Sequence, residues 1–216
     1  MQETGELPGN TKVTRQDWLN VAMDLLISDG MSEVKVLTIG ERLGVSRSSF
    51  YWYFKSRKDL LEQLLAEWER TNTGIMVAHS ELPADDIVDA LNNFFRCVVN
   101  PDGFNHQLDF AIREWARRDG AVRRVVDRSD AARQNAVARM FARHGYSEAD
   151  ADIRARVLYY QQIGYYALEL NETLEDRLAR VPGYLFAFTG VMPRQDQIDE
   201  FSDYARAISG ETQAGV

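Results

Sequence analysis

The sequence predicts an all-α protein with an N-terminal three-helix head and a larger C-terminal helical body. Apolar residues recur three and four positions apart through most of the 216 residues, and no segment alternates with a period of two. Glycine and proline separate these stretches, as is typical of helix ends. Hydrophobic residues make up 45% of the chain, which is enough for a sizeable core in one or two domains.

The first predicted helix extends from a Thr14 cap to Gly30. Asp17 stands three residues after Thr14, in the position of a capping box. Trp18 and Leu25 fall on one face of this helix, together with Ala22 and Leu26. This face is expected to close the core of the head.

A short helix–turn–helix pair is predicted next, in the stretch from Leu37 to Leu61. Gly40 permits another segment to approach closely, and Gly44 can adopt the left-handed conformation that ends a helix. Ser46 is a favourable N-cap. The second helix of the pair is therefore expected over Arg47 to about Phe54.

Four consecutive aromatic rings, from Tyr51 to Phe54, occupy the end of that second helix. They could all be core residues, but consecutive positions point in all directions around a helix, so we expect some of them to face outward. No acidic residue occurs between Ser46 and Lys58. Exposed rings beside hydroxyls and cations suit a nucleic-acid groove, where rings contact thymine methyls and cations neutralise phosphates.

This stretch resembles the DNA-binding domain of the tetracycline-repressor-like (TetR) family of bacterial transcription regulators. The detailed resemblance covers about Thr11 to Leu65. The positions that match are Ile39, Gly40, Gly44, Val45, Ser46, Phe50, Tyr51, Tyr53, Phe54, Ser56, Arg57 and Leu60, with Trp18, Ala22 and Gly30 before them. Two departures are Gly40, where Ala is usual, and Lys35, where a capping Ser or Thr is common.

The resemblance implies a set of DNA contacts. The expected base-edge readers are Arg47, Ser48, Ser49 and Trp52, and the expected phosphate contacts are Lys35, Tyr51, Tyr53, Lys55, Arg57 and Lys58. The partner is then double-stranded DNA with a near-palindromic operator.

The net charge of −8 is unevenly distributed. Residues 11–60 contain eight Lys or Arg against six Asp or Glu, a balance of +2, whereas the chain after Leu60 carries −8. A mildly basic head is thus followed by an acidic body, which limits non-specific adhesion to nucleic acid.

The body is predicted to consist of helices alone. They are expected over 57–73, 85–99, 104–117, 121–144, from a Ser147 cap to about 170, over 174–181, then after an interruption at Pro182 and Gly183, and finally from Pro193 onward. The helix from Ile153 to Leu170 is apolar on several faces, more than one core can cover. We therefore expect it to contribute to a homodimer interface, together with helices after Leu174.

The resemblance further implies a small-molecule effector bound in the body. The ring-rich and polar candidates for this pocket are Phe94, Cys97, Phe104, Phe110, Trp115, Tyr159, Gln162 and Tyr166, and the expected effector is apolar or aromatic. Each of these residues could instead fill the core or the dimer seam, and Cys97 in particular suits a small core position.

The expected organisation is a flexible tail at 1–10, a helix-turn-helix DNA-binding domain at 11–60, a ligand-binding and dimerisation domain at 61–210, and a frayed tail at 211–216. The lone cysteine, and the lack of a signal peptide or an apolar run of about 18 residues, fit a cytoplasmic protein without a membrane span.

Together these expectations describe a dimeric, sequence-specific DNA-binding regulator, a repressor that its small-molecule effector releases from DNA. Two alternatives to this function remain. One is an architectural DNA-binding protein without an effector, which would not need so large and ring-rich a body. The other is an all-helical enzyme, but catalytic motifs are lacking and the three histidines are far apart, so no metal or cofactor is expected.

Overall fold

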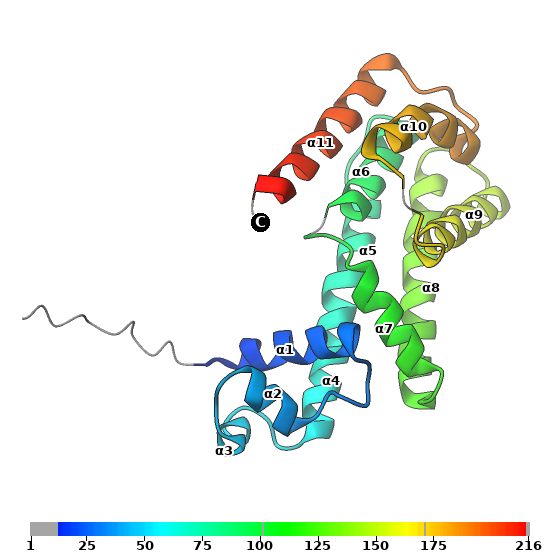
Figure 1. Ribbon diagram of the computed structural model, residues 1–216. Helices are drawn as coiled ribbons and strands as arrows, with labels where there is room; N and C mark the ends of the chain where they lie inside the picture. Colours follow the sequence, from blue (N-terminus) through cyan, green and yellow to red (C-terminus); the bar gives the residue numbers. More distant parts are fainter. Residues whose placement is uncertain (1–12, 101, 171, 215–216) are drawn as a thin grey trace, which may run out of the picture. The chain divides into compact units, whose positions relative to one another are not determined.

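The computed structural model describes residues 13–100, 102–170 and 172–214, with the side chains of 211–214 left undescribed. Every regular element in these ranges is a helix, so the all-α prediction is confirmed (Figure 1). The chain divides into two compact units, with the boundary between Leu65 and Ala66. The expected tail at 1–10 lies outside the described residues.

The first unit contains α1 (Arg15–Ser28), α2 (Val36–Arg42), α3 (Arg47–Phe50) and the first part of α4 (Arg57–Trp68). Thr14 and Asp17 form the predicted capping box at the start of α1. Gly30 and Gly44 both adopt positive φ angles, +79° and +65°, so the two glycines end their helices as the sequence indicates.

Two details of this unit differ from expectation. α3 is shorter than predicted, because the N–H groups of Tyr51, Trp52 and Tyr53 bond three residues back rather than four, which replaces the α-helix by tight turns. Ser46 occupies the N-cap position but makes no side-chain cap bond, since its hydroxyl pairs with that of Ser48 at 2.8 Å.

The second unit begins within α4 and continues through a π-helical turn, η1 (Glu69–Thr73), into α5 (Gly74–Glu81). The remaining helices are α6 (Ile87–Val99), α7 (His106–Ala116), α8 (Gly120–Arg143), α9 (Glu148–Ala167), α10 (Leu174–Thr189) and α11 (Gln195–Ala214). α8 packs against α5, α7 and α9, and α11 packs against α6 and α10. Asp86, Asn105, Asp119, Ser147 and Thr173 cap the helices that follow them.

The predicted interruption at Pro182 is wrong, because α10 continues through it to Thr189. A proline costs its helix one hydrogen bond but does not have to end it, and buried Leu178 and Leu185 anchor the helix on both sides. α11 begins at Gln195 rather than at Pro193 and continues past Gly210 to Ala214, while residues 215–216 lie outside the described part. None of the described helices is long and apolar enough to cross a membrane.

Candidate nucleic-acid interface and ligand pocket

An aromatic core fixes the position of α3 in the first unit. Phe50 and Phe54 are buried and stacked with ring centroids 5.2 Å apart, and Trp18 meets Phe50 edge-on at 5.3 Å. Gly40 carries no Cβ, and one placed there would lie 3.2 Å from the Val45 carbonyl oxygen. Gly40 therefore lets the turn before α3 pack directly on α2.

The rings of Tyr51 and Trp52 point outward, as predicted for some of the four consecutive rings. Trp52 is 76% exposed and Tyr51 is 53% exposed. Leu37, at the start of α2, is 60% exposed and completes the set of exposed large hydrophobic side chains in the described part of this unit. Water is a poor solvent for such side chains, so a patch of this kind indicates a surface that meets a partner.

A shallow groove of about 420 Å³ lies beside these side chains. It is lined by Lys35, Val36, Leu37, Arg47, Tyr51, Lys55, Ser56 and Arg57. Four of these residues are cationic and none is acidic, so a polyanion would meet positive charge along the whole groove. Five of these residues are among the predicted DNA contacts, whereas Leu37 is not, because an apolar side chain gives no signal for DNA binding in the sequence.

The cations differ in what they already bind. Arg47 and Lys55 form no ion pair with any described residue, whereas Lys35 pairs with Glu33 at 3.1 Å and Lys58 with Glu62 at 3.7 Å. Arg57 donates to the carbonyl oxygens of Val34 at 2.6 Å and Met31 at 3.2 Å. Arg47 donates a hydrogen bond to the Tyr51 hydroxyl at 3.4 Å. Without ion pairs among the described residues, Arg47 and Lys55 are thus the groove cations freest to contact DNA.

Three residues predicted to contact DNA already use their hydroxyl groups in hydrogen bonds within the unit. The Tyr53 hydroxyl donates to the Val13 carbonyl at 2.6 Å, and the Ser49 hydroxyl donates to the Ser46 carbonyl at 2.8 Å. Ser48 is exposed and shares its hydrogen bond with Ser46. These hydroxyls keep accepting capacity, and their role on DNA stays a prediction.

Most of the residues expected to form a ligand pocket are instead buried in the second unit. Phe94, Cys97, Phe104, Trp115 and Tyr159 are all buried. The Cys97 thiol donates to the Phe94 carbonyl, and burial raises its pKa to about 12. Phe110 is half-buried on α7 and lines none of the cavities described below.

Tyr166 is anchored rather than free. Its hydroxyl donates to the Val98 carbonyl at 2.8 Å, and its ring stacks on His106 with centroids 4.6 Å apart. Burial raises the pKa of Tyr166 and lowers that of His106, because each charged form would lose water. Of the eight predicted ligand residues, only Gln162 lines the apolar cavity of this unit.

That cavity has a volume of about 90 Å³ and lies among α6, α9, α10 and α11. Its walls are Phe95, Val98, Val99, Gln161, Gln162, Tyr165, Glu172, Leu174, Arg177, Leu178, Val181, Tyr184, Leu185, Phe188, Phe201 and Ala205. We call it the α10 pocket, because α10 supplies many of these residues. A mostly apolar hollow with a few polar groups is the usual form of a small-molecule site.

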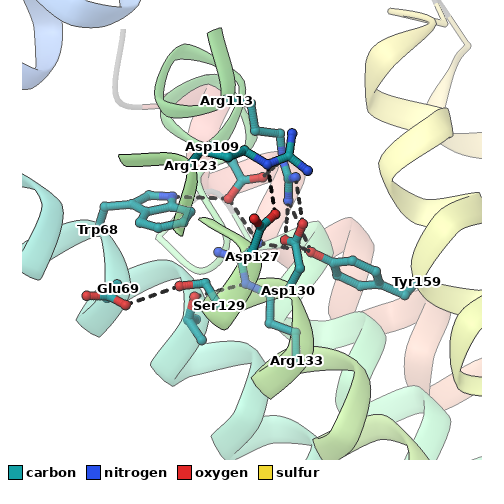
Figure 2. Close-up of polar contacts among 11 residues, drawn as sticks. Trp68, Glu69, Asp109, Arg113, Arg123, Asp127, Ser129, Asp130, Arg133 and Tyr159 are labelled. Carbon is teal, nitrogen blue, oxygen red and sulfur yellow. Dashed lines mark hydrogen bonds and ion pairs between the residues drawn. The ribbon is translucent and has the colours of Figure 1, made fainter. Parts of the chain in front are cut away.

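A buried polar network lies elsewhere in the second unit (Figure 2). The Asp109 carboxylate accepts from Trp68 Nε1 at 3.1 Å, from Arg133 Nη1 at 2.9 Å and from Arg113 Nε at 2.8 Å. Arg113 also pairs with Asp130 at 2.6 Å. Asp109 and Arg133 are fully buried, so their charges depend on this network for compensation.

The pKa shifts in the network follow from burial and partners. Burial alone would raise the pKa of Asp130, but the hydrogen bonds and charge of Arg113 outweigh it, so that pKa is lowered. Burial raises the pKa of Tyr159 to about 12 against the opposing charge of Arg133. Tyr159 donates to Asp130 at 2.7 Å. It therefore acts as a structural hydrogen-bond donor.

An apolar stripe on α9 is left uncovered. Ile153, Val157 and Tyr160 follow one another along the helix and are all exposed. Tyr184 and Phe186 on α10 are exposed as well. Among the described residues, no group of three or more His, Cys, Asp or Glu could hold a metal ion.

Comparison with known proteins extends this description. The family model of "Bacterial regulatory proteins, tetR family" matches residues 19–64, which include α2, α3 and most of α1. Tetracycline repressor protein class C of Escherichia coli is 28% identical over 186 residues, covering 86% of this chain and 79% of that protein. The regulator AcrR of Shigella flexneri is 30% identical over 105 residues, covering 49% of this chain and 45% of AcrR.

Solved structures share the fold. A transcriptional regulator from Aquifex aeolicus has a TM-score of 0.58 at 14% identity, covering 82% of this chain and 95% of its own. Salmonella enterica GusR has a TM-score of 0.56 at 16% identity, covering 90% of this chain and 94% of its own.

A helix-turn-helix with an outward cationic groove, followed by a helical body, defines a DNA-binding transcriptional regulator. The relatives that match are themselves named as regulators or repressors. Residues 19–64 thus match the DNA-binding domain of the tetR family of bacterial regulatory proteins.

Proposed function

We propose that this regulator is a homodimeric repressor that binds a near-palindromic DNA site and is released from it by a small apolar or aromatic molecule. It would act in the cytoplasm and carry no enzymatic activity. The groove lined by Lys35, Arg47, Lys55 and Arg57 beside exposed Tyr51 and Trp52 is the observation that carries the DNA-binding part. In this proposal α3 enters the major groove and the cations hold the flanking phosphates.

The proposal assigns separate tasks to the exposed side chains. Arg47, Ser48, Ser49 and Trp52 read base edges, whereas Lys55 and Arg57 contact phosphates whatever the sequence. Support for the division comes from exposure, since Trp52 is the most exposed of the described large hydrophobic side chains and Lys55 has no competing ion pair among the described residues.

A dimer is proposed because one short recognition helix reads too few base pairs for specificity. A two-fold dimer places two such helices one DNA turn apart, about 34–36 Å. The stripe Ile153, Val157 and Tyr160, with exposed Phe186 of α10, supplies apolar surface for a second copy. Sedimentation at micromolar concentration tests this, and a monomer that still bound its operator would contradict it.

Release by a ligand is proposed on two grounds. Tetracycline repressor protein class C is a repressor by name, and the α10 pocket is a mostly apolar hollow of the kind that binds small molecules.

The proposed mechanism of release acts through α4. This helix begins in the first unit and ends in the second, so a ligand that tilts its far end would move the recognition helices off their one-turn spacing. A coupling of roughly 1–3 kcal/mol would change operator affinity about 5–150-fold.

The experiment that tests this function maps binding across the organism's own genome, starting with the DNA that adjoins its gene. Discrete near-palindromic footprints are expected. Uniform coating would instead favour an architectural protein, and catalytic turnover without DNA affinity would favour an enzyme. For any effector found, its dissociation constant must rise in the presence of operator by the same factor as operator affinity falls.

A further inference from the structure

We infer that the α10 pocket binds a small carboxylic acid with a single aryl ring or short alkyl body, and that Arg177 binds its carboxylate. This inference rests on the proposed function, because it names the chemical class of the effector. The supporting observations are the apolar wall of the pocket and one arginine in that wall, Arg177, which forms no ion pair with any described residue.

The wall of the pocket limits the size of the occupant. Leu178, Leu185, Phe188 and Phe201 are buried residues that present side chains to a cavity of about 90 Å³. An engineered apolar cavity of about 150 Å³ accommodates benzene in another protein. The α10 pocket is smaller than that, so a short chain or part of a single ring is the largest apolar body that it encloses without rearrangement, and the polar end of the molecule would lie toward the rim.

Arg177 stands out among the arginines near this pocket. Arg180, one turn further along α10, pairs with Glu172, and Arg206 of α11 pairs with Glu175 at 3.0 Å. Arg177 is half-buried and forms no ion pair with any residue that the structure describes. Its guanidinium instead lies over the Tyr165 ring, 5.5 Å from the centroid.

The one carboxylate on the wall of the pocket is already engaged. Glu172 accepts from Arg180 through one oxygen and from the Tyr165 hydroxyl, at 3.1 Å, through the other. It is thus held by two donors other than Arg177. A guanidinium with several N–H donors beside an apolar hollow is suited to a carboxylate, which it can bind through two parallel hydrogen bonds.

The positive charge of Arg177 also affects the pKa values of two neighbouring tyrosines. Burial raises the pKa of Tyr165 and of Tyr166, and the charge of Arg177 opposes that rise at both hydroxyls. At Tyr165 the charge of Glu172 acts in the opposite direction, but Arg180 pairs with Glu172, so Arg177 is the cation of the pocket wall left to meet an anion. A neutral molecule of equal shape would gain at most a weaker hydrogen bond from Arg177 without the attraction between charges, and a cation would be repelled.

The test uses nearly isosteric probes that differ in charge. Calorimetry on the full chain should compare benzoate, benzamide and benzamidine, and then 3-phenylpropanoate with its amide. We expect at least one acid to bind, its amide to bind at least roughly tenfold more weakly, and benzamidine not to bind. Tenfold is the loss expected from a charge-assisted hydrogen bond.

Variants identify the residue responsible. Arg177→Gln should reduce the affinity for the acid roughly tenfold or more, and Arg177→Lys should restore part of it. Arg206→Gln is the matched control, since neither Arg206 nor its partner Glu175 lines the pocket, and it should leave acid binding unchanged. Equal binding of acid and amide, an unchanged affinity in Arg177→Gln, or no binding by either acid would overturn the inference.

Operator affinity is measured separately, so that the two claims can fail independently. If an acid binds through Arg177 but operator affinity stays the same, the inference about the pocket stands and release through the α10 pocket is refuted. If neither acid binds while a different compound releases the operator, the inference is refuted and the proposed function stands.

Discussion

The groove of the first unit and the buried network of the second use the same kinds of side chain in opposite ways. In the groove, Arg47 and Lys55 are exposed, without an ion pair among the described residues. In the network, Arg113 and Arg133 are enclosed by Asp109, Asp130 and Tyr159 (Figure 2). An exposed unpaired cation costs little in water and remains available to a partner, whereas a buried cation must be neutralised from within.

This difference predicts which property of the protein changes when each residue is substituted. Removing a groove residue should change DNA binding and leave folding almost untouched, since water solvates what remains. Removing a network residue should change folding, because its partner stays buried without compensation.

The largest effect is expected from Asp109→Ala. Arg133 would lose the carboxylate that compensates its fully buried charge, and Trp68 Nε1 would lose its acceptor. We expect the free energy of unfolding to fall by about 3–5 kcal/mol, measured by denaturant titration with circular dichroism. A loss below about 1 kcal/mol would mean that the network behaves like a surface ion pair, and the comparison would fail.

Trp52→Ala should act on DNA affinity instead. Loss of one base contact is expected to cost about 1–3 kcal/mol on the operator and to relax sequence preference at one position, with unfolding free energy unchanged. Binding isotherms on the operator and on single-position variants of it would measure this. Leu82→Ala, a substitution at an exposed leucine of the second unit, serves as control and should have no effect.

Lys55→Ala should weaken binding to all sequences alike. A lost phosphate contact is expected to lower the slope of log affinity against log salt by about 0.9. Arg57→Ala should lower the slope similarly but also disturb the loop before α2, since Arg57 holds the Val34 and Met31 carbonyls. Arg139→Ala, at an exposed cation of the second unit, is the control. If Lys55→Ala changed sequence preference, the division into readers and phosphate contacts would be wrong.

The smallest effect is expected from Asp127→Asn. Asp127 pairs with Arg123 at 2.8 Å, but both side chains are exposed and four residues apart on α8. We expect the unfolding free energy to change by no more than about 0.5 kcal/mol, measured as for Asp109→Ala. A larger loss would show that distance between partners, rather than burial, decides the energy of the ion pairs in this unit.

Much of the fold could be predicted from the sequence because it depends on local signals. Helical periodicity predicted the helices, and Gly44 and the capping box of Thr14 and Asp17 predicted their ends. The run of rings predicted that some of them face outward, as Tyr51 and Trp52 do. The helix interruption predicted at Pro182 is wrong, because packing on both sides of a proline can hold a helix together and cannot be recognised from local sequence.

The pocket could not be located in this way. Rings such as Phe94 and Tyr159 fill a core as readily as they line a cavity, and only packing distinguishes the two. Asp109 and Arg113 have the spacing of an exposed helical ion pair although Asp109 is fully buried. Arg177 resembles any helix-surface arginine, because what distinguishes it is a missing partner, which only the structure can show.

The exposure of Trp52 also has a spectroscopic consequence. Of the four tryptophans, Trp18, Trp68 and Trp115 are buried, so an aqueous quencher such as iodide or acrylamide would reach the indole of Trp52 far more readily than the others. Titrated DNA would shield that indole and leave the fluorescence of the other three as an internal reference. The chain thus carries its own optical label at the candidate interface.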